Sequence, residues 1–113
     1  MIYSHSLRIG SCRRQNSDKS EELASHGYIV VAIDHVNAVT SVFPNGQVVH
    51  GTAPSDRCDR AAFQTLLGHA IRDIVFALDE LNTNDALLAG RMDLERLGAL
   101  GYSWGCIPVA EFG

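Results

Sequence analysis

The stretch that decides the fold of this chain is Leu97-Gly98-Ala99-Leu100-Gly101-Tyr102-Ser103-Trp104-Gly105-Cys106. A short apolar run leads into Gly-Tyr-Ser-Trp-Gly, which has the G-x-S-x-G spacing of a sharp turn between a strand and a helix. The serine of such a turn takes a strained backbone conformation. Gly101 and Gly105 flank Ser103 because side chains at those positions would collide across the turn. The pattern predicts a strand over residues 97–100 and a helix over residues 104–112.

A serine held in this way is a candidate nucleophile. The turn lifts the Ser103 hydroxyl clear of the sheet and directs backbone N–H groups toward the start of the following helix, where negative charge is favoured. The same N–H groups would stabilise the anionic tetrahedral intermediate of an acyl transfer. The stretch therefore indicates nucleophilic catalysis by Ser103.

The rest of the chain alternates strands and helices. Residues 28–33 are apolar and rich in β-branched side chains, which is typical of a strand covered on both faces of a parallel sheet. A long helix is predicted over residues 59–81, where apolar side chains recur at three- and four-residue spacing and polar residues such as Asp73 fall outside this stripe. A shorter helix is predicted over residues 18–26, with Asp18 as its N-cap and Glu21 completing a capping box.

Two further β-elements complete the expected fold. Residues 1–4 read as a strand, and Asn45-Gly46 lies between two short β-segments, which is a strong hairpin signal. We expect this hairpin to lie over the same edge of the sheet as Ser103. The resulting class is α/β, with a three-stranded, mainly parallel sheet, flanking helices and a small β-hairpin excursion.

The length and composition of the chain limit its number of domains and its possible partners. The 113 residues suffice for a single domain over 1–113, and the net charge of -4 argues against a nucleic-acid partner. The three cysteines lack a C-x-x-C pair and read as reduced thiols, which favours a cytoplasmic location. We find neither a metal-ligand spacing nor a phosphate loop, so we expect no cofactor and no metal. We also expect no membrane span, because no stretch approaches the length of a transmembrane helix.

Three stretches resemble the α/β-hydrolase superfamily, and within it the platelet-activating-factor acetylhydrolase and dienelactone-hydrolase-like esterases. Residues 2–6, Ile-Tyr-Ser-His-Ser, resemble the third strand of that family and its His-Gly oxyanion loop. Residues 21–35 resemble helix A and the fourth strand, and residues 88–105 resemble the approach to the fifth strand and the nucleophile elbow. The resemblance implies a partial α/β-hydrolase fold.

The same resemblance implies a role for particular residues. Ser103 matches the catalytic nucleophile, and the backbone N–H of Trp104 matches one donor of the oxyanion hole. The N–H of Leu7, or that of Ser6, matches the second donor. His5 matches the histidine that shapes the oxyanion loop rather than the general base of the family. Family topology also places the strand that starts the chain between the other two parallel strands.

The chain departs from the family in ways that affect the chemistry. The acidic and histidine members of the triad follow the nucleophile in this fold, and they have no counterpart in the sequence up to Gly113. Ser6 replaces the usual glycine of the oxyanion loop. The resemblance therefore implies a truncated domain. Because a serine hydroxyl is a poor nucleophile alone, catalysis would need another histidine as base. His5 and His35 both follow predicted strands and are the candidates.

Two functional interpretations remain open. The first is a serine carboxylesterase that hydrolyses short-chain carboxylic esters through Ser103. The second is a non-catalytic hydrolase fragment that acts as a binding or structural module, or as one part of a larger hydrolase completed by another polypeptide. In either case the outer strands would be open edges, which favour pairing with another chain. We therefore expect a homodimer.

Overall fold

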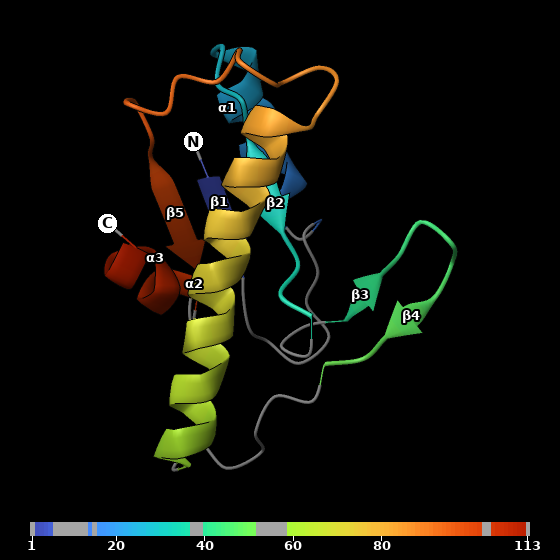
Figure 1. Ribbon diagram of the computed structural model, residues 1–113, viewed down its shortest axis with the longest axis vertical. Helices are drawn as coiled ribbons and strands as arrows, with labels where there is room; N and C mark the ends of the chain where they lie inside the picture. The colour runs from blue at the N-terminus through green and yellow to red at the C-terminus, as the bar shows by residue number, and fades with distance from the viewer. Residues whose placement is uncertain are drawn as a thin grey trace.

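A three-stranded parallel sheet lies at the centre of the molecule. The computed structural model describes residues 2–5, 14, 16–36, 40–51, 59–102 and 105–112, with the side chains of residues 2–5 and 112 left out. The sheet consists of β1 (Ile2–His5), β2 (Val31–Ile33) and β5 (Ala99–Tyr102) in the order β2-β1-β5 (Figure 1). The first strand of the chain is therefore central, as family topology predicted, and the α/β class is confirmed.

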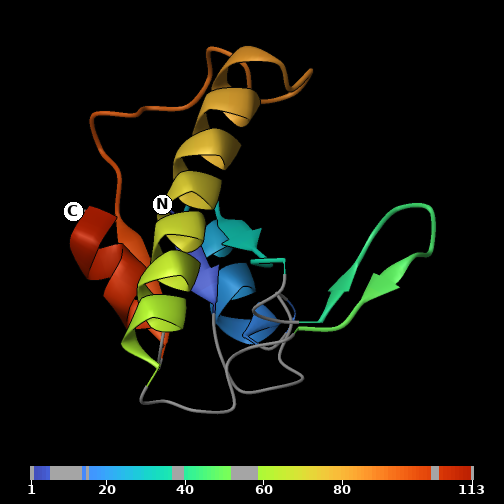
Figure 2. The same ribbon diagram turned by 60° about the horizontal axis from the view of Figure 1, so that its bottom comes forward.

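Helices lie on both sides of this sheet. α1 (Ser17–Ser25) lies behind it in Figure 1, where Lys19 of α1 places its ammonium 5.9 Å from the centre of the Tyr102 ring. α2 (Arg60–Thr83) and α3 (Cys106–Phe112) pack against each other on the other side, as Figures 1 and 2 show, and α3 also packs on β5. Two helical layers around a parallel sheet are what its apolar strands require.

The long helix α2 follows from its sequence. Asp59 is the N-cap, and its carboxylate accepts a hydrogen bond of 2.9 Å from the backbone N–H of Ala62. Ala70 and Ile74 lie one turn apart and are the buried residues of the helix, so they mark the face that packs inward. The prediction of a helix over residues 59–81 is confirmed, with its end two residues later at Thr83.

The length of α2 also corrects one expectation. The helix has 24 residues, and an 18-residue window within it reaches a mean hydropathy of 1.2, so by length and composition alone it could cross a membrane. The expectation that no stretch approaches the length of a transmembrane helix was therefore wrong. Only 11% of that window is buried in the structure. Much of the apolar surface of α2 is therefore still uncovered among the described residues.

α1 begins and ends one residue earlier than predicted, at Ser17 and Ser25. The helix begins at Ser17 with Asn16 as N-cap, so Asp18 lies inside the first turn and cannot form the predicted capping box. The side chain of Asn16 makes no cap hydrogen bond. At the other end Gly27 has a φ of 88°, and its N–H donates to the carbonyl of Ala24. This left-handed glycine stops the helix as expected.

The remaining elements are shifted or shorter than predicted. β2 starts only at Val31, β5 occupies 99–102 rather than 97–100, and α3 starts at Cys106 rather than residue 104. Strand pairing decides the limits of β2 and β5, because only residues opposite a partner on β1 join the sheet.

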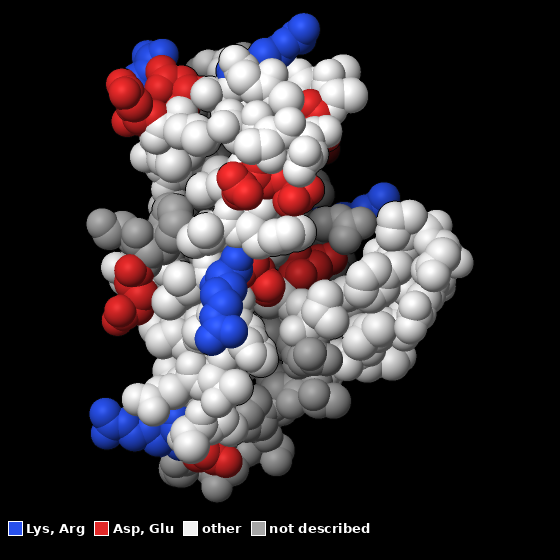
Figure 3. Space-filling model, viewed as in Figure 1, with Lys and Arg blue, Asp and Glu red and all other residues white. Residues whose placement is uncertain are grey.

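The predicted hairpin forms from β3 (Ser41–Val42) and β4 (Val48–Val49), which pair in antiparallel fashion. Gly46 in its turn has a φ of 83°. The hairpin projects sideways from the body of the molecule rather than lying over the sheet edge (Figures 1 and 2). Its residues 40–51 include no Lys, Arg, Asp or Glu, and Figure 3 shows the hairpin as a lobe without these residues.

Candidate functional site

The turn between β5 and α3 brings two glycines into direct contact. A Cβ atom built on Gly101 would overlap the carbonyl group of Gly105 and would lie 2.5 Å from the backbone nitrogen of Cys106. Gly105 is buried, and the Cys106 thiol donates a hydrogen bond of 2.9 Å to the carbonyl oxygen of Gly101. The end of the strand and the start of the helix therefore cross at backbone contact distance, as a G-x-S-x-G turn requires.

Several predicted site residues fall outside this description. Ser103 and Trp104, the expected nucleophile and oxyanion donor, lie outside the described residues, as do Ser6 and Leu7. The backbone of His5 is described as the last residue of β1, but its side chain is not. Their proposed roles therefore stay predictions.

The strand register brings three chain segments to one edge of the sheet. Ser4 of β1 lies level with Ile33 of β2 on one side and with Gly101 of β5 on the other. Because the strands are parallel, all three continue past their carboxyl ends at the same edge, where α/β proteins place their ligands. His35 follows Ile33 by two residues at this edge, and His5 lies level with Tyr102.

His35 is held at this edge by a carboxylate from α2. Its Nδ1 atom lies 2.9 Å from Oδ2 of Asp73, at hydrogen-bond distance. The histidine side chain is 1% exposed, whereas Asp73 is 43% exposed. The pair therefore joins the end of β2 to the middle of α2, across a sequence separation of 38 residues.

Sequence reasoning missed Asp73 because it assigned that residue to the polar side of the long helix. The helical spacing contained the missing signal, since Asp73 precedes the buried Ile74 and follows the buried Ala70 by three residues. A polar residue at such a position borders the inward stripe and can reach a partner there. Three other histidines are exposed: His26 after the end of α1, His69 in α2 and His50 beside the hairpin.

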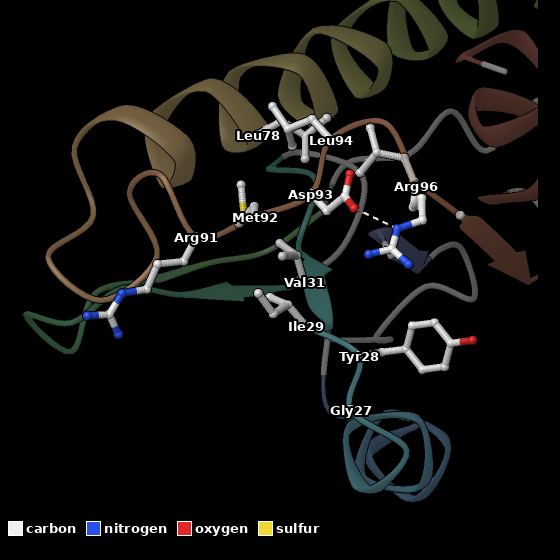
Figure 4. Close-up of a pocket in the computed structure, with 12 residues that line it drawn as sticks. Gly27, Tyr28, Ile29, Val31, Leu78, Arg91, Met92, Asp93, Leu94 and Arg96 are labelled. Atoms are coloured by element: carbon white, nitrogen blue, oxygen red, sulfur yellow. Dashed lines mark hydrogen bonds and ion pairs between the residues drawn. The ribbon is translucent and has the colours of Figure 1, made fainter.

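A cavity of about 620 Å³ opens at the opposite edge of the sheet. Its lining comes from the segment before β2, the C-terminal part of α2 and the segment before β5 (Figure 4). The lining residues are Gly27, Tyr28, Ile29, Val31, Leu78, Arg91, Met92, Asp93, Leu94, Arg96, Leu97 and Gly98. The cavity therefore lies at the amino ends of the strands, away from the Gly101–Gly105 turn.

An ion pair at this cavity lowers the pKa of one carboxyl group. The Arg96 side chain donates a hydrogen bond of 2.6 Å to Asp93, as Figure 4 shows, and this bond holds the pKa of the Asp93 carboxyl below its usual value. Within the described residues no cluster of three or more His, Cys, Asp or Glu side chains could hold a metal ion. Cys106 is a free, exposed cysteine.

Comparison with known proteins gives one coarse assignment. No family model and no curated protein matches the chain with significant similarity. Among solved structures it is similar to a ferulic acid esterase from Streptomyces cinnamoneus, with 30% sequence identity and a TM-score of 0.81 over 98% of this chain. The match covers 31% of that esterase, so the chain spans about a third of its length. This likeness supports an esterase-like hydrolase of the α/β class and does not single out the platelet-activating-factor acetylhydrolases.

Proposed function

We propose that this chain is an α/β-hydrolase domain that hydrolyses short-chain carboxylic esters through Ser103. The observation that carries the proposal is the backbone contact of Gly101 with Gly105 and Cys106, the residues that flank Ser103 and Trp104 in the sequence. Such a tight strand-to-helix crossing serves to expose a residue at its tip. The likeness to a ferulic acid esterase supports ester bonds as the target.

The proposed reaction has two steps. The Ser103 hydroxyl attacks the ester carbonyl, its proton passes to a base, and the alcohol leaves as the acyl-enzyme forms. Water then attacks the acyl-enzyme and releases the carboxylic acid. In both steps the N–H of Trp104 and that of Leu7 or Ser6 would hold the oxyanion. His5 and His35 are the candidate bases, because both belong to segments that end at the same edge of the sheet as β5.

The test is ester hydrolysis by the purified protein beside Ser103→Ala. The substrates are p-nitrophenyl butyrate and, because of the named activity of the similar esterase, methyl ferulate. Ser25→Ala is the matched control, since Ser25 is an exposed serine of α1 that bonds only locally to Glu22 and His26. We expect activity in the wild type and in Ser25→Ala, and its loss in Ser103→Ala. Equal rates in all three proteins would overturn the proposal.

A second candidate function is that the chain forms one part of a larger hydrolase, or acts as a non-catalytic binding module. The observation that favours it is uncovered apolar surface. Tyr102 of β5 is 58% exposed and Phe76 of α2 is 65% exposed, although sheets and helices of this class usually bury such residues. We propose that a second chain, in the simplest case another copy of this one, covers part of this surface.

A further inference from the structure

His35 and Asp73 tie together the parts of the fold that would form the oxyanion hole. We propose that they are a positioning pair, in which the buried hydrogen bond fixes the carboxyl end of β2 against α2. This inference rests on the proposed ester hydrolysis by Ser103. It assigns Asp73 a role in that reaction, and it assigns His35 a role other than that of base.

The pair reaches both halves of the proposed site through direct packing. On one side, β2 pairs with β1 up to Ser4, and β1 continues through His5 into the segment expected to supply an oxyanion donor. On the other side, α2 packs against α3, whose first residue, Cys106, closes the Gly101 turn. A bond between β2 and α2 therefore fixes the spacing between the two segments that would hold the oxyanion.

The burial of His35 favours positioning over proton transfer. A general base must present a ring nitrogen to the reacting group within about 3 Å, whereas the His35 side chain is only 1% exposed. Its Nδ1 atom is engaged with Asp73, whose own side chain reaches the surface. The hydrogen bond to Asp73 satisfies one nitrogen of this buried ring.

The experiment compares variants that remove the hydrogen bond between His35 and Asp73 with variants that replace one partner by an amide able to keep it. His35→Ala and Asp73→Ala remove it, whereas His35→Asn keeps a donor near the place of Nδ1 and Asp73→Asn keeps an acceptor. We expect the alanine variants to lower kcat on the order of 10- to 100-fold with little change in KM, because small misplacements at a site have effects of this size. The two asparagine variants should stay close to the wild type.

The asparagine variants separate this role from that of a base. If His35 were the base and Asp73 its orienting carboxylate, both asparagine variants would lose activity, Asp73→Asn by on the order of 10⁴-fold. That result would overturn the proposal. The matched control is Asp79→Asn, an exposed residue of the same helix, which should leave kcat unchanged. The Ser103→Ala rate serves as the baseline, so a failure of ester hydrolysis itself is recognised separately.

A second measurement needs no activity. Amide hydrogen exchange of the whole protein should become on the order of tenfold faster in α3 and at the end of β1 when Asp73 is replaced by alanine. Asp79→Ala should leave both regions unchanged. If exchange in Asp73→Ala increases only beside His35 and Asp73 themselves, the bond is a local contact and the proposal is wrong, whether or not the protein hydrolyses esters.

Discussion

Gly101 and Gly105 lie so close across the β5–α3 turn that a methyl group on Gly101 would occupy the space of the Gly105 backbone. The contact is between main-chain atoms, which cannot rotate away as a side chain would. The two glycines of the G-x-S-x-G pattern are therefore explained by packing, independently of any role of the serine between them.

Gly101→Ala should destabilise the protein by about 1–3 kcal/mol, the cost of overpacking a filled site. Urea unfolding followed by circular dichroism measures this loss. Gly68→Ala is the control, because a Cβ there would meet only the end of the Arg72 side chain at 3.9 Å. That change in the middle of α2 should stabilise the helix by about 0.5–1 kcal/mol. Equal stability of Gly101→Ala and the wild type would contradict the close crossing.

Replacing Asp59 by alanine should cost about 1 kcal/mol, because its carboxylate caps the N–H of Ala62 at the start of α2. Asp18→Ala should cost less, since Asp18 lies inside the first turn of α1 and not at its N-cap. Thermal unfolding of both variants checks the difference. A larger loss of stability in Asp18→Ala than in Asp59→Ala would indicate that Asp18 caps α1, contrary to the structure.

The two faces of α2 should respond differently to truncation. Ile74 is fully buried, so Ile74→Ala should cost about 2–5 kcal/mol. Phe76 is 65% exposed, and Phe76→Ala should change the stability of the monomer by less than about 0.5 kcal/mol. Denaturant titration at low protein concentration tests both. A large loss at Phe76 would mean that a partner covers this face.

The Asp93–Arg96 pair gives a pH prediction. Because the pKa of Asp93 is lowered in the folded state, the contribution of the pair is present above the ordinary carboxyl pKa and is lost as pH falls through the lowered value. Arg96→Ala should raise the pKa of Asp93 toward its usual value, as carboxyl-carbon NMR titration would record. Arg91→Ala, at the same cavity, should leave it unchanged. An unaltered Asp93 titration in Arg96→Ala would refute the assigned cause.

Self-association is the prediction that follows from β5. Leu100 and Tyr102 are exposed on the same face of this outer strand of the described sheet. We expect light scattering at micromolar concentration to give the mass of a dimer, and Leu100→Lys to give that of a monomer, because a lysine blocks edge pairing. Leu87→Lys, at a 73% exposed position outside the sheet, should stay dimeric. A monomeric wild type would exclude the dimer.

The sequence by itself determined the α/β class, the long helix, the hairpin turn and the two glycines around Ser103. Each of these depends on residues close together in the chain: helical periodicity over 59–81, the Asn45-Gly46 pair, and the G-x-S-x-G spacing. The limits of β2 and β5 were less predictable, because a strand ends where its neighbour on β1 stops pairing. That neighbour is distant in the sequence.

Only the tertiary structure decided which polar residue meets His35. Asp73 lies 38 residues away along the chain, and the helical pattern placed it on the polar side of α2. The packing of α2 across the sheet turned that position toward the end of β2, where the enclosed imidazole needed a hydrogen-bond partner. Periodicity reveals which residues face inward, but the depth and rotation of a helix on its sheet are set by contacts between distant segments.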